Sequence, residues 1–264
     1  MDKNRIYVAT FSANASETAK KYGFGLELND LCISENLNPE VREEILKQMK
    51  SELKEADTDN VIIHGPFTEL NPSSIDGRAV ELAKVRYEEA YECCRQMNVK
   101  KMVVHSGLIP LIYYPSWHIE KSVPFWKDIL KNMEDDFILY IENVFDEEPY
   151  TLMKIIDEVA DSRLKICLDI GHANAVTKAD ITVFDWIEIL GKRIGHMHIH
   201  NNDGSGDTHS SLTDGDMDMK AVLDMAFEKC DENLTLTIES RETVEGAAWL
   251  NNYLKEKNGG QFDE

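Results

Sequence analysis

Six successive apolar segments of the chain each run into a histidine, an aspartate or a glutamate. One of them adds a second histidine within a turn, and the loop after another carries an Asp-Thr-His sequence. Imidazole nitrogens and carboxylate oxygens, without cysteine, are donors that suit Zn²⁺ or Mn²⁺. The nine residues placed in this way are His64, His105, Glu142, Asp169, His172, His198, Asp207, His209 and Glu239.

The loops that follow these segments contain almost no lysine or arginine. Carboxylates gathered at one face without a counter-charge would carry a large electrostatic cost. Single members have simpler explanations: His64 or His105 alone could be a packed histidine, and Glu142 alone could pair with a core arginine. Because each member would need its own such explanation, the pattern favours a divalent metal centre of one to three zinc or manganese ions.

The segment around residue 198 carries three alternating histidines, His196, His198 and His200. Side chains of a strand alternate between its two faces, so these three share one face but differ in depth. We expect His198 to lie level with the other candidate ligands and His196 to pack deeper in the core. We expect His200 at the rim, where it is a candidate for substrate binding.

The elements that must position these residues are eight strand-like segments separated by helical patterns. Most of the segments are β-branched and almost continuously apolar, as strands covered on both faces must be. They are Arg5–Phe11, Phe24–Asp30, Asn60–Pro66, Lys100–Ser106, Phe137–Val144, Leu164–Ile170, Ile194–Asn201 and Leu234–Ser240.

Helical periodicity fills the intervals. It predicts helices over Pro39–Ala56, Asp76–Met97, Pro149–Ala160 and about Thr243–Lys255. Eight alternating strand and helix units in 264 residues predict an α/β fold, a single-domain (β/α)8 TIM barrel over residues 1–257 with a loose tail at 258–264. An open doubly wound sheet is the alternative, but the first strand is not followed by its usual glycine-rich turn. In a barrel, all the candidate ligands would meet at the carboxyl-terminal face of the strands.

The composition limits the cellular environment and the kinds of partner that can be expected for the protein. The chain has 49 acidic and 28 basic side chains, a formal charge of −21, and 42% hydrophobic residues. Apolar runs long enough to cross a membrane are absent, and the 5 cysteines show no paired spacing, which favours reduced thiols. We therefore predict a cytoplasmic protein with no membrane partner; a homo-oligomer stays open.

Taken in order, these residues resemble the xylose isomerase-like barrel superfamily, which holds sugar isomerases, sugar epimerases and the endonuclease IV enzymes that cut DNA at abasic sites. The resemblance runs from the third strand to the eighth. For the epimerase-like members it implies a four-residue metal set on the last four strands. In this chain that set is Glu142, Asp169, His198 and Glu239.

That branch implies a metal-dependent isomerase or epimerase of a sugar or sugar phosphate. The metal would stabilise an enediolate, and Glu142 and Glu239 would be the catalytic pair that moves a proton at carbon. His172 and Arg241 would hold substrate oxygens, with Arg241 as the anchor for a phosphate. We take this as the first functional expectation.

The endonuclease IV branch implies nine ligands for three zinc ions, and all nine positions are filled here. The alternative expectation is therefore a zinc phosphodiesterase, acting on abasic DNA or on a small phosphate ester. The sequence departs from that branch at Ser210–Asp216, where its Leu-Gly-Glu-Gly stretch is missing. Phe67 stands where a DNA-contacting tyrosine is expected, and the turns after the first two strands have no arginine.

Charge distinguishes the possible substrates. The loops on the site side carry only two basic residues, Lys178 and Arg241. A protein that holds a duplex needs a basic stripe, because each phosphate contact must be neutralised. We therefore expect a small-molecule sugar or phosphate ester as the substrate, in preference to nucleic acid. A barrel that binds metal and ligand without turnover is the third expectation.

Overall fold

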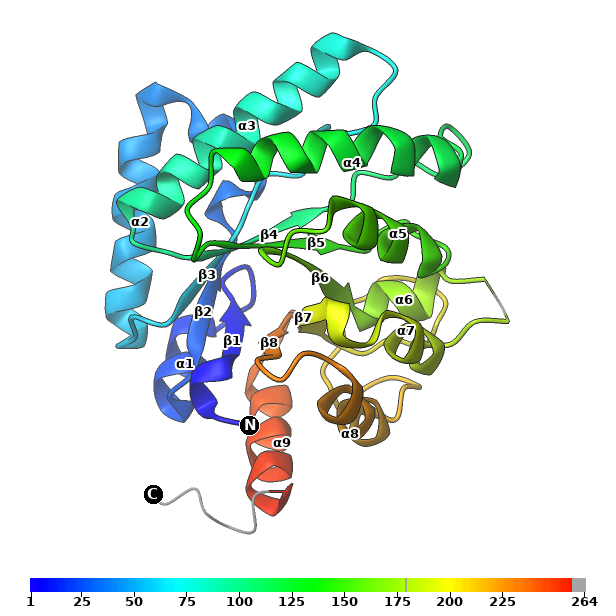
Figure 1. The fold of residues 1–264 in the computed structure, drawn as a ribbon. Helices are drawn as coiled ribbons and strands as arrows, with labels where there is room; N and C mark the ends of the chain where they lie inside the picture. The colour runs from blue at the N-terminus through cyan, green and yellow to red at the C-terminus, as the bar shows by residue number, and fades with distance from the viewer. Residues whose placement is uncertain (179, 258–264) are drawn as a thin grey trace.

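The computed structural model describes residues 1–178 and 180–257. It is a closed barrel of eight parallel strands in consecutive order, and β1 pairs with β8 to close the ring (Figure 1). The strands are β1 (Ile6–Ala9), β2 (Gly25–Leu28), β3 (Val61–His64), β4 (Lys101–His105), β5 (Ile138–Glu142), β6 (Leu164–Asp169), β7 (Ile194–Ile199) and β8 (Thr235–Ile238). The predicted (β/α)8 architecture is confirmed.

Each strand is shorter than its apolar segment, because residues at one or both ends lie outside the hydrogen-bonded ladder. This trimming decides where the candidate ligands lie. His64, His105, Glu142 and Asp169 are the last residues of their strands, whereas Glu239 follows the end of β8 directly. These residues therefore lie at the carboxyl-terminal rim of the barrel.

Helices cover the outside of the barrel, as Figure 1 shows for the long α2, α3 and α4. α2 has the predicted bounds, with Pro39 at its start and Asp57 in a left-handed conformation after its end. The connection from β6 to β7 holds two helices, so the described residues form nine α-helices, one more than the eight predicted. The α-helices of the described residues are α1 (Ala15–Tyr22), α2 (Pro39–Ala56), α3 (Gly77–Gln96), α4 (Pro115–Lys131), α5 (Tyr150–Val159), α6 (Ile170–Val176), α7 (Val183–Leu190), α8 (Met219–Lys229) and α9 (Val244–Lys257).

The core has two parts. A large apolar layer lies between strands and helices, and a small cluster fills the barrel interior, with Tyr7, Ile62, Val103, Tyr140 and Cys167 as its buried members. The ring of His196 packs edge-on against Tyr7 in this inner cluster, with centroids 6.3 Å apart. Apolar side chains and His196 thus fill the barrel interior, and the polar candidate ligands lie at the carboxyl-terminal ends of the strands.

The cysteines and the helices bear on two further predictions from the sequence. All five cysteines are free, as the spacing predicted. In the described part of the chain, none of the helices combines the length and apolarity needed to cross a bilayer. The tail predicted at 258–264 lies outside the described residues.

Candidate metal centre

The nine predicted ligands converge at the carboxyl-terminal mouth of the barrel and form three groups. The first group consists of His64, His105 and Glu142, from β3, β4 and β5. Glu142 Oε2 lies 3.2 Å from His64 Nε2 and 3.5 Å from His105 Nε2. Three neighbouring strands thus direct two imidazole nitrogens and one carboxylate oxygen at a common point.

The second group surrounds His198 on β7. Its Nδ1 atom lies 3.3 Å from Glu142 Oε1, 3.3 Å from Glu239 Oε1 and 3.8 Å from Asp169 Oδ2. This nitrogen is buried and has no hydrogen-bond partner. An orphaned imidazole nitrogen among three buried carboxylates is the donor set that a divalent cation satisfies. The residues present therefore fit a metal ion.

The third group consists of His172, Asp207 and His209, in α6 and the loop after β7. Asp207 Oδ2 lies 3.2 Å from His172 Nε2 and 3.0 Å from His209 Nε2. The Asp207 side chain is one-third exposed, so this group faces the solvent side of the mouth. His172 Nδ1 is also 3.4 Å from Glu142 Oε1, which places this group beside the other two.

Hydrogen bonds to the backbone fix which nitrogen of each histidine faces the site. His64, His172 and His209 donate Nδ1–H to the carbonyls of Gly65, Asn143 and Glu239, at 3.0, 3.1 and 2.8 Å. Each leaves Nε2 directed at a carboxylate of its group. Metal-ligating histidines are oriented in this way by a second partner on the opposite nitrogen.

Glu27 on β2 was missed by the sequence analysis. It is fully buried, and its Oε1 accepts a hydrogen bond from His198 Nε2 at 3.0 Å, while Oε2 accepts from His196 Nε2 at 3.2 Å and from the Thr237 hydroxyl. Glu27 therefore orients His198 with Nδ1 toward the second group. The available signal was an acidic residue in the middle of the apolar segment Phe24–Asp30.

Electrostatics in the site follow from burial and mutual pairing. Burial alone would raise the pKa of Glu142, but the surrounding histidines, His198 first, hold it well below its ordinary value. Burial lowers the pKa of His105 to about 3. Burial also opposes protonation of His209, yet its hydrogen bond with Asp207 raises its pKa to about 9. Protons on such histidines must leave when a cation binds, so metal binding and proton release are coupled.

His200 follows directly after the end of β7, and its side chain is fully buried. Its Nε2 lies 3.1 Å from Asp169 Oδ1. The space comes from Gly171: a β-carbon there would lie 1.9 Å from His200 Cε1. His196 is deep, as expected, with Nδ1 2.6 Å from the Thr235 hydroxyl. The role of His200 in substrate binding stays a prediction.

Of the two basic residues of the mouth, Lys178 is paired with an acidic side chain and Arg241 is exposed. Lys178 forms an ion pair with Glu147 at 3.6 Å. Arg241 donates its backbone N–H to the His209 carbonyl at 3.0 Å, which fixes its backbone beside the third group, and its side chain is exposed. Arg241 is thus free to approach an anion near that group.

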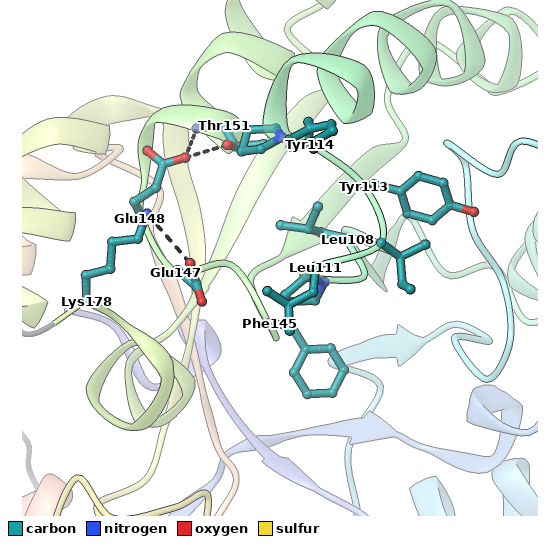
Figure 2. Close-up of a pocket in the computed structure, with 12 residues that line it drawn as sticks. Leu108, Leu111, Tyr113, Tyr114, Phe145, Glu147, Glu148, Thr151 and Lys178 are labelled. Atoms are coloured by element: carbon teal, nitrogen blue, oxygen red, sulfur yellow. Dashed lines mark hydrogen bonds and ion pairs between the residues drawn. The ribbon is translucent and has the colours of Figure 1, made fainter.

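Apolar side chains line the opposite side of the mouth, on the loops after β3, β4 and β5. The ring of Phe67 stacks on His105, with centroids 4.0 Å apart and planes 7° apart. A cavity of about 280 Å³ lies beside the loop after β4, lined by Leu108, Leu111 and Phe145 and bordered by the Glu147–Lys178 pair (Figure 2). A second cavity, of about 420 Å³, borders His105 itself.

Parallel strands with alternating helices and a polar site at the strand ends define the protein as a TIM barrel with an enzyme-like centre. Residues 17–253 match the family described as xylose isomerase-like TIM barrel. The chain therefore belongs to this family, whose members include isomerases, epimerases and endonuclease IV enzymes.

Two curated proteins resemble the chain in sequence. An uncharacterized protein of Methanocaldococcus jannaschii, MJ1311, is 28% identical over 77% of this chain and 73% of its own. A probable endonuclease 4 of Mycobacterium leprae is 24% identical over 62% of this chain and 67% of its own.

Solved structures share the fold. A D-tagatose 3-epimerase-like protein superposes with a TM-score of 0.76 at 24% identity, over 97% of this chain and 98% of its own. The Thermus thermophilus protein TTHB071, soaked with zinc chloride, gives 0.74 at 20% identity, over 96% and 98%.

Proposed function

We propose that the protein is a metal-dependent phosphoesterase that acts on a small phosphate ester. The observation that carries this proposal is the convergence of three ligand groups, not one, around a shared carboxylate. A single-metal isomerase would need only the group around His198. The additional groups around Glu142 and Asp207 are unexplained by that reaction but suit the charge of a phosphoryl group.

The roles of the chain's own residues follow from where their atoms point. Glu142 contacts all three groups, with Oε2 toward His64 and His105 and Oε1 toward His198 and His172. It therefore holds the three sites in register. When bound, divalent ions would polarise a phosphoryl oxygen and raise the acidity of water.

Substrate size follows from charge. The described loops of the mouth carry Lys178, which is paired with Glu147, and Arg241, whose side chain is exposed. One free guanidinium suits one phosphate, whereas a duplex needs about 6–10 basic contacts to be held tightly. The probable endonuclease 4 relatives support the chemistry of this proposal, and the acidic mouth argues for a smaller substrate than theirs.

Metal-dependent epimerisation of a sugar is the second candidate, and one observation favours it. Glu142 and Glu239 both face His198 Nδ1, yet their pKa values are displaced in opposite directions. Neighbouring histidines lower that of Glu142, whereas burial, together with Glu142 and Asp169, raises that of Glu239 despite His198. Two carboxyl groups at one site, one of which binds a proton more readily than the other, are the arrangement that proton transfer at carbon uses. The epimerase-like structural neighbour supports this candidate.

Metal content per chain separates the two candidates. The protein reconstituted with zinc is dialysed and its zinc measured by mass spectrometry, for the wild type and for Asp207→Asn. We expect one ion per ligand group in the wild type and one fewer in the variant, together with hydrolysis of bis(4-nitrophenyl) phosphate by the wild type. One ion in both proteins, with no hydrolysis, would contradict the phosphoesterase and leave the epimerase.

Abasic DNA tests the size argument. Cleavage of an abasic duplex at low salt, by zinc-loaded protein, is compared with hydrolysis of the small diester. We expect the small diester to be the better substrate. Efficient duplex cleavage that persists at physiological salt would contradict the inference from charge.

A further inference from the structure

The cavity beside His105 points to the organic part of the substrate. This cavity, of about 420 Å³, is lined mainly by apolar side chains from the loops after β3, β4 and β5. The apolar members are Phe67, Leu70, Leu108, Ile109, Val144 and Phe145. We propose that it binds an uncharged, apolar group of the substrate while the phosphate lies at the metal centre, an inference that rests on the proposed function.

Continuity with the metal centre supports this occupant. His105 belongs to the first ligand group and also forms part of the cavity wall. Phe67 is also part of this wall, and its ring stacks on the His105 ring. A molecule with its phosphate at the metal centre and its ester oxygen directed past His105 would therefore place its organic substituent in this cavity.

Charge argues against an anionic substituent. Among the described residues that line the cavity, Glu69 is the one with a formal charge, and it is exposed. In the part of the chain that the structure describes, no lysine or arginine lines the cavity. Burying an anion here would leave it without a partner, which is costly, whereas an apolar group gains free energy in proportion to the area it buries.

Exposure of the walls shows that they are available to a ligand. Ile109 is 45% exposed and Phe145 is 55% exposed, although both belong to loops that adjoin the metal centre. Leu70 and Leu108 form a buried floor, 5% and 8% exposed. A planar or alicyclic group placed between floor and rim would cover the two exposed side chains.

Two phosphonates with the same head and different substituents test the proposal. Methylphosphonate and phenylphosphonate are titrated into zinc-loaded protein by calorimetry, so the readout is binding and not turnover. A phenyl group that buries roughly 100 Å² of apolar surface gains on the order of fiftyfold at about 25 cal/mol per Å². Allowing for immobilisation, we expect phenylphosphonate to bind at least about tenfold more tightly.

Two matched variants test whether the gain in affinity for phenylphosphonate comes from this cavity. Phe145→Ser removes a cavity wall, and Phe184→Ser removes an exposed phenylalanine on α7, 39% exposed and outside the cavity. We expect Phe145→Ser to reduce the preference for phenylphosphonate severalfold and to leave the affinity for methylphosphonate unchanged. We expect Phe184→Ser to change neither affinity. Equal binding of the two phosphonates, or a preference that survives Phe145→Ser, would overturn the inference.

The outcomes separate failure of the inference from failure of the proposed function. If neither phosphonate binds to the zinc-loaded protein, the proposed phosphoesterase centre fails. If both bind equally, the centre stands and the apolar subsite is refuted. Molar mass in solution is measured for the same proteins; if Phe145→Ser changes the oligomeric state but not the phosphonate preference, the surface is an interface between copies and the inference is overturned.

Discussion

Glu27 offers the sharpest test of how the barrel builds its site. Its carboxylate holds His198 Nε2 at 3.0 Å from the side opposite the candidate ligands, and both side chains are fully buried. Glu27→Gln keeps the size of the side chain but removes its charge and one of its two accepting oxygens. The amide can accept from His198 or from His196 and Thr237, but it cannot accept from all three.

The expected magnitude follows from this loss. Removing the outer partner of a metal-ligating histidine costs about 10–100-fold in metal affinity. That is about 1.4–2.7 kcal/mol. Because His198 is the sole histidine of the second group, whereas the other two groups contain two each, the loss should fall on one class of zinc sites and spare the others.

Zinc affinity is measured by competition with a fluorescent chelator at neutral pH, with circular dichroism of the same samples as a check of folding. Asp146→Asn is the matched control, because Asp146 is also a buried carboxyl, bonded to Ser106 and outside the three ligand groups. We expect the control to bind zinc as the wild type does. A folded Glu27→Gln protein with unchanged affinity at every site would refute the argument that Glu27 positions His198.

Three further predictions address the surroundings of the site. Gly171→Ala should lower the free energy of unfolding by about 1–3 kcal/mol in a denaturant titration, because its β-carbon would overlap the buried His200 ring; unchanged stability would show that His200 can move. His118 is buried, and burial lowers its pKa to about 4, against about 6.5 in an unfolded chain. The unfolded state therefore binds the extra proton as pH falls from 6.5 towards 4, so stability declines there with a slope of up to about 1.4 kcal/mol per pH unit; His118→Gln should flatten that decline in unfolding curves, and an unaltered slope would contradict the assignment. Removing metal with a chelator should lower the melting temperature of wild-type protein, because ligands that bind only the native state stabilise it; calorimetry showing the same melting temperature with and without zinc would argue against a metal centre.

Much of the fold and of the site could be predicted because both depend on local patterns. Nearly continuous apolar segments alternating with helical periodicity identify a parallel barrel, and the residues that end those segments must then share one rim. His64, His105, Glu142 and Asp169 were placed in this way, since each ends its own strand. The free state of the five cysteines could likewise be predicted, because their spacing along the chain shows no pairs.

What the tertiary structure decided depends on contacts that close only when the barrel closes. Glu27 and His198 are 171 residues apart and meet inside the ring of strands, so periodicity within either segment says nothing of their pairing. His200 is buried because Gly171, on another element, leaves space for its ring. The division of nine ligands into three groups, and the apolar cavity that borders one of them, likewise arise from loops that meet only across the finished mouth. The residues that could supply the chemistry can therefore be predicted from the sequence. Their grouping and orientation depend on packing between segments that are far apart in the chain.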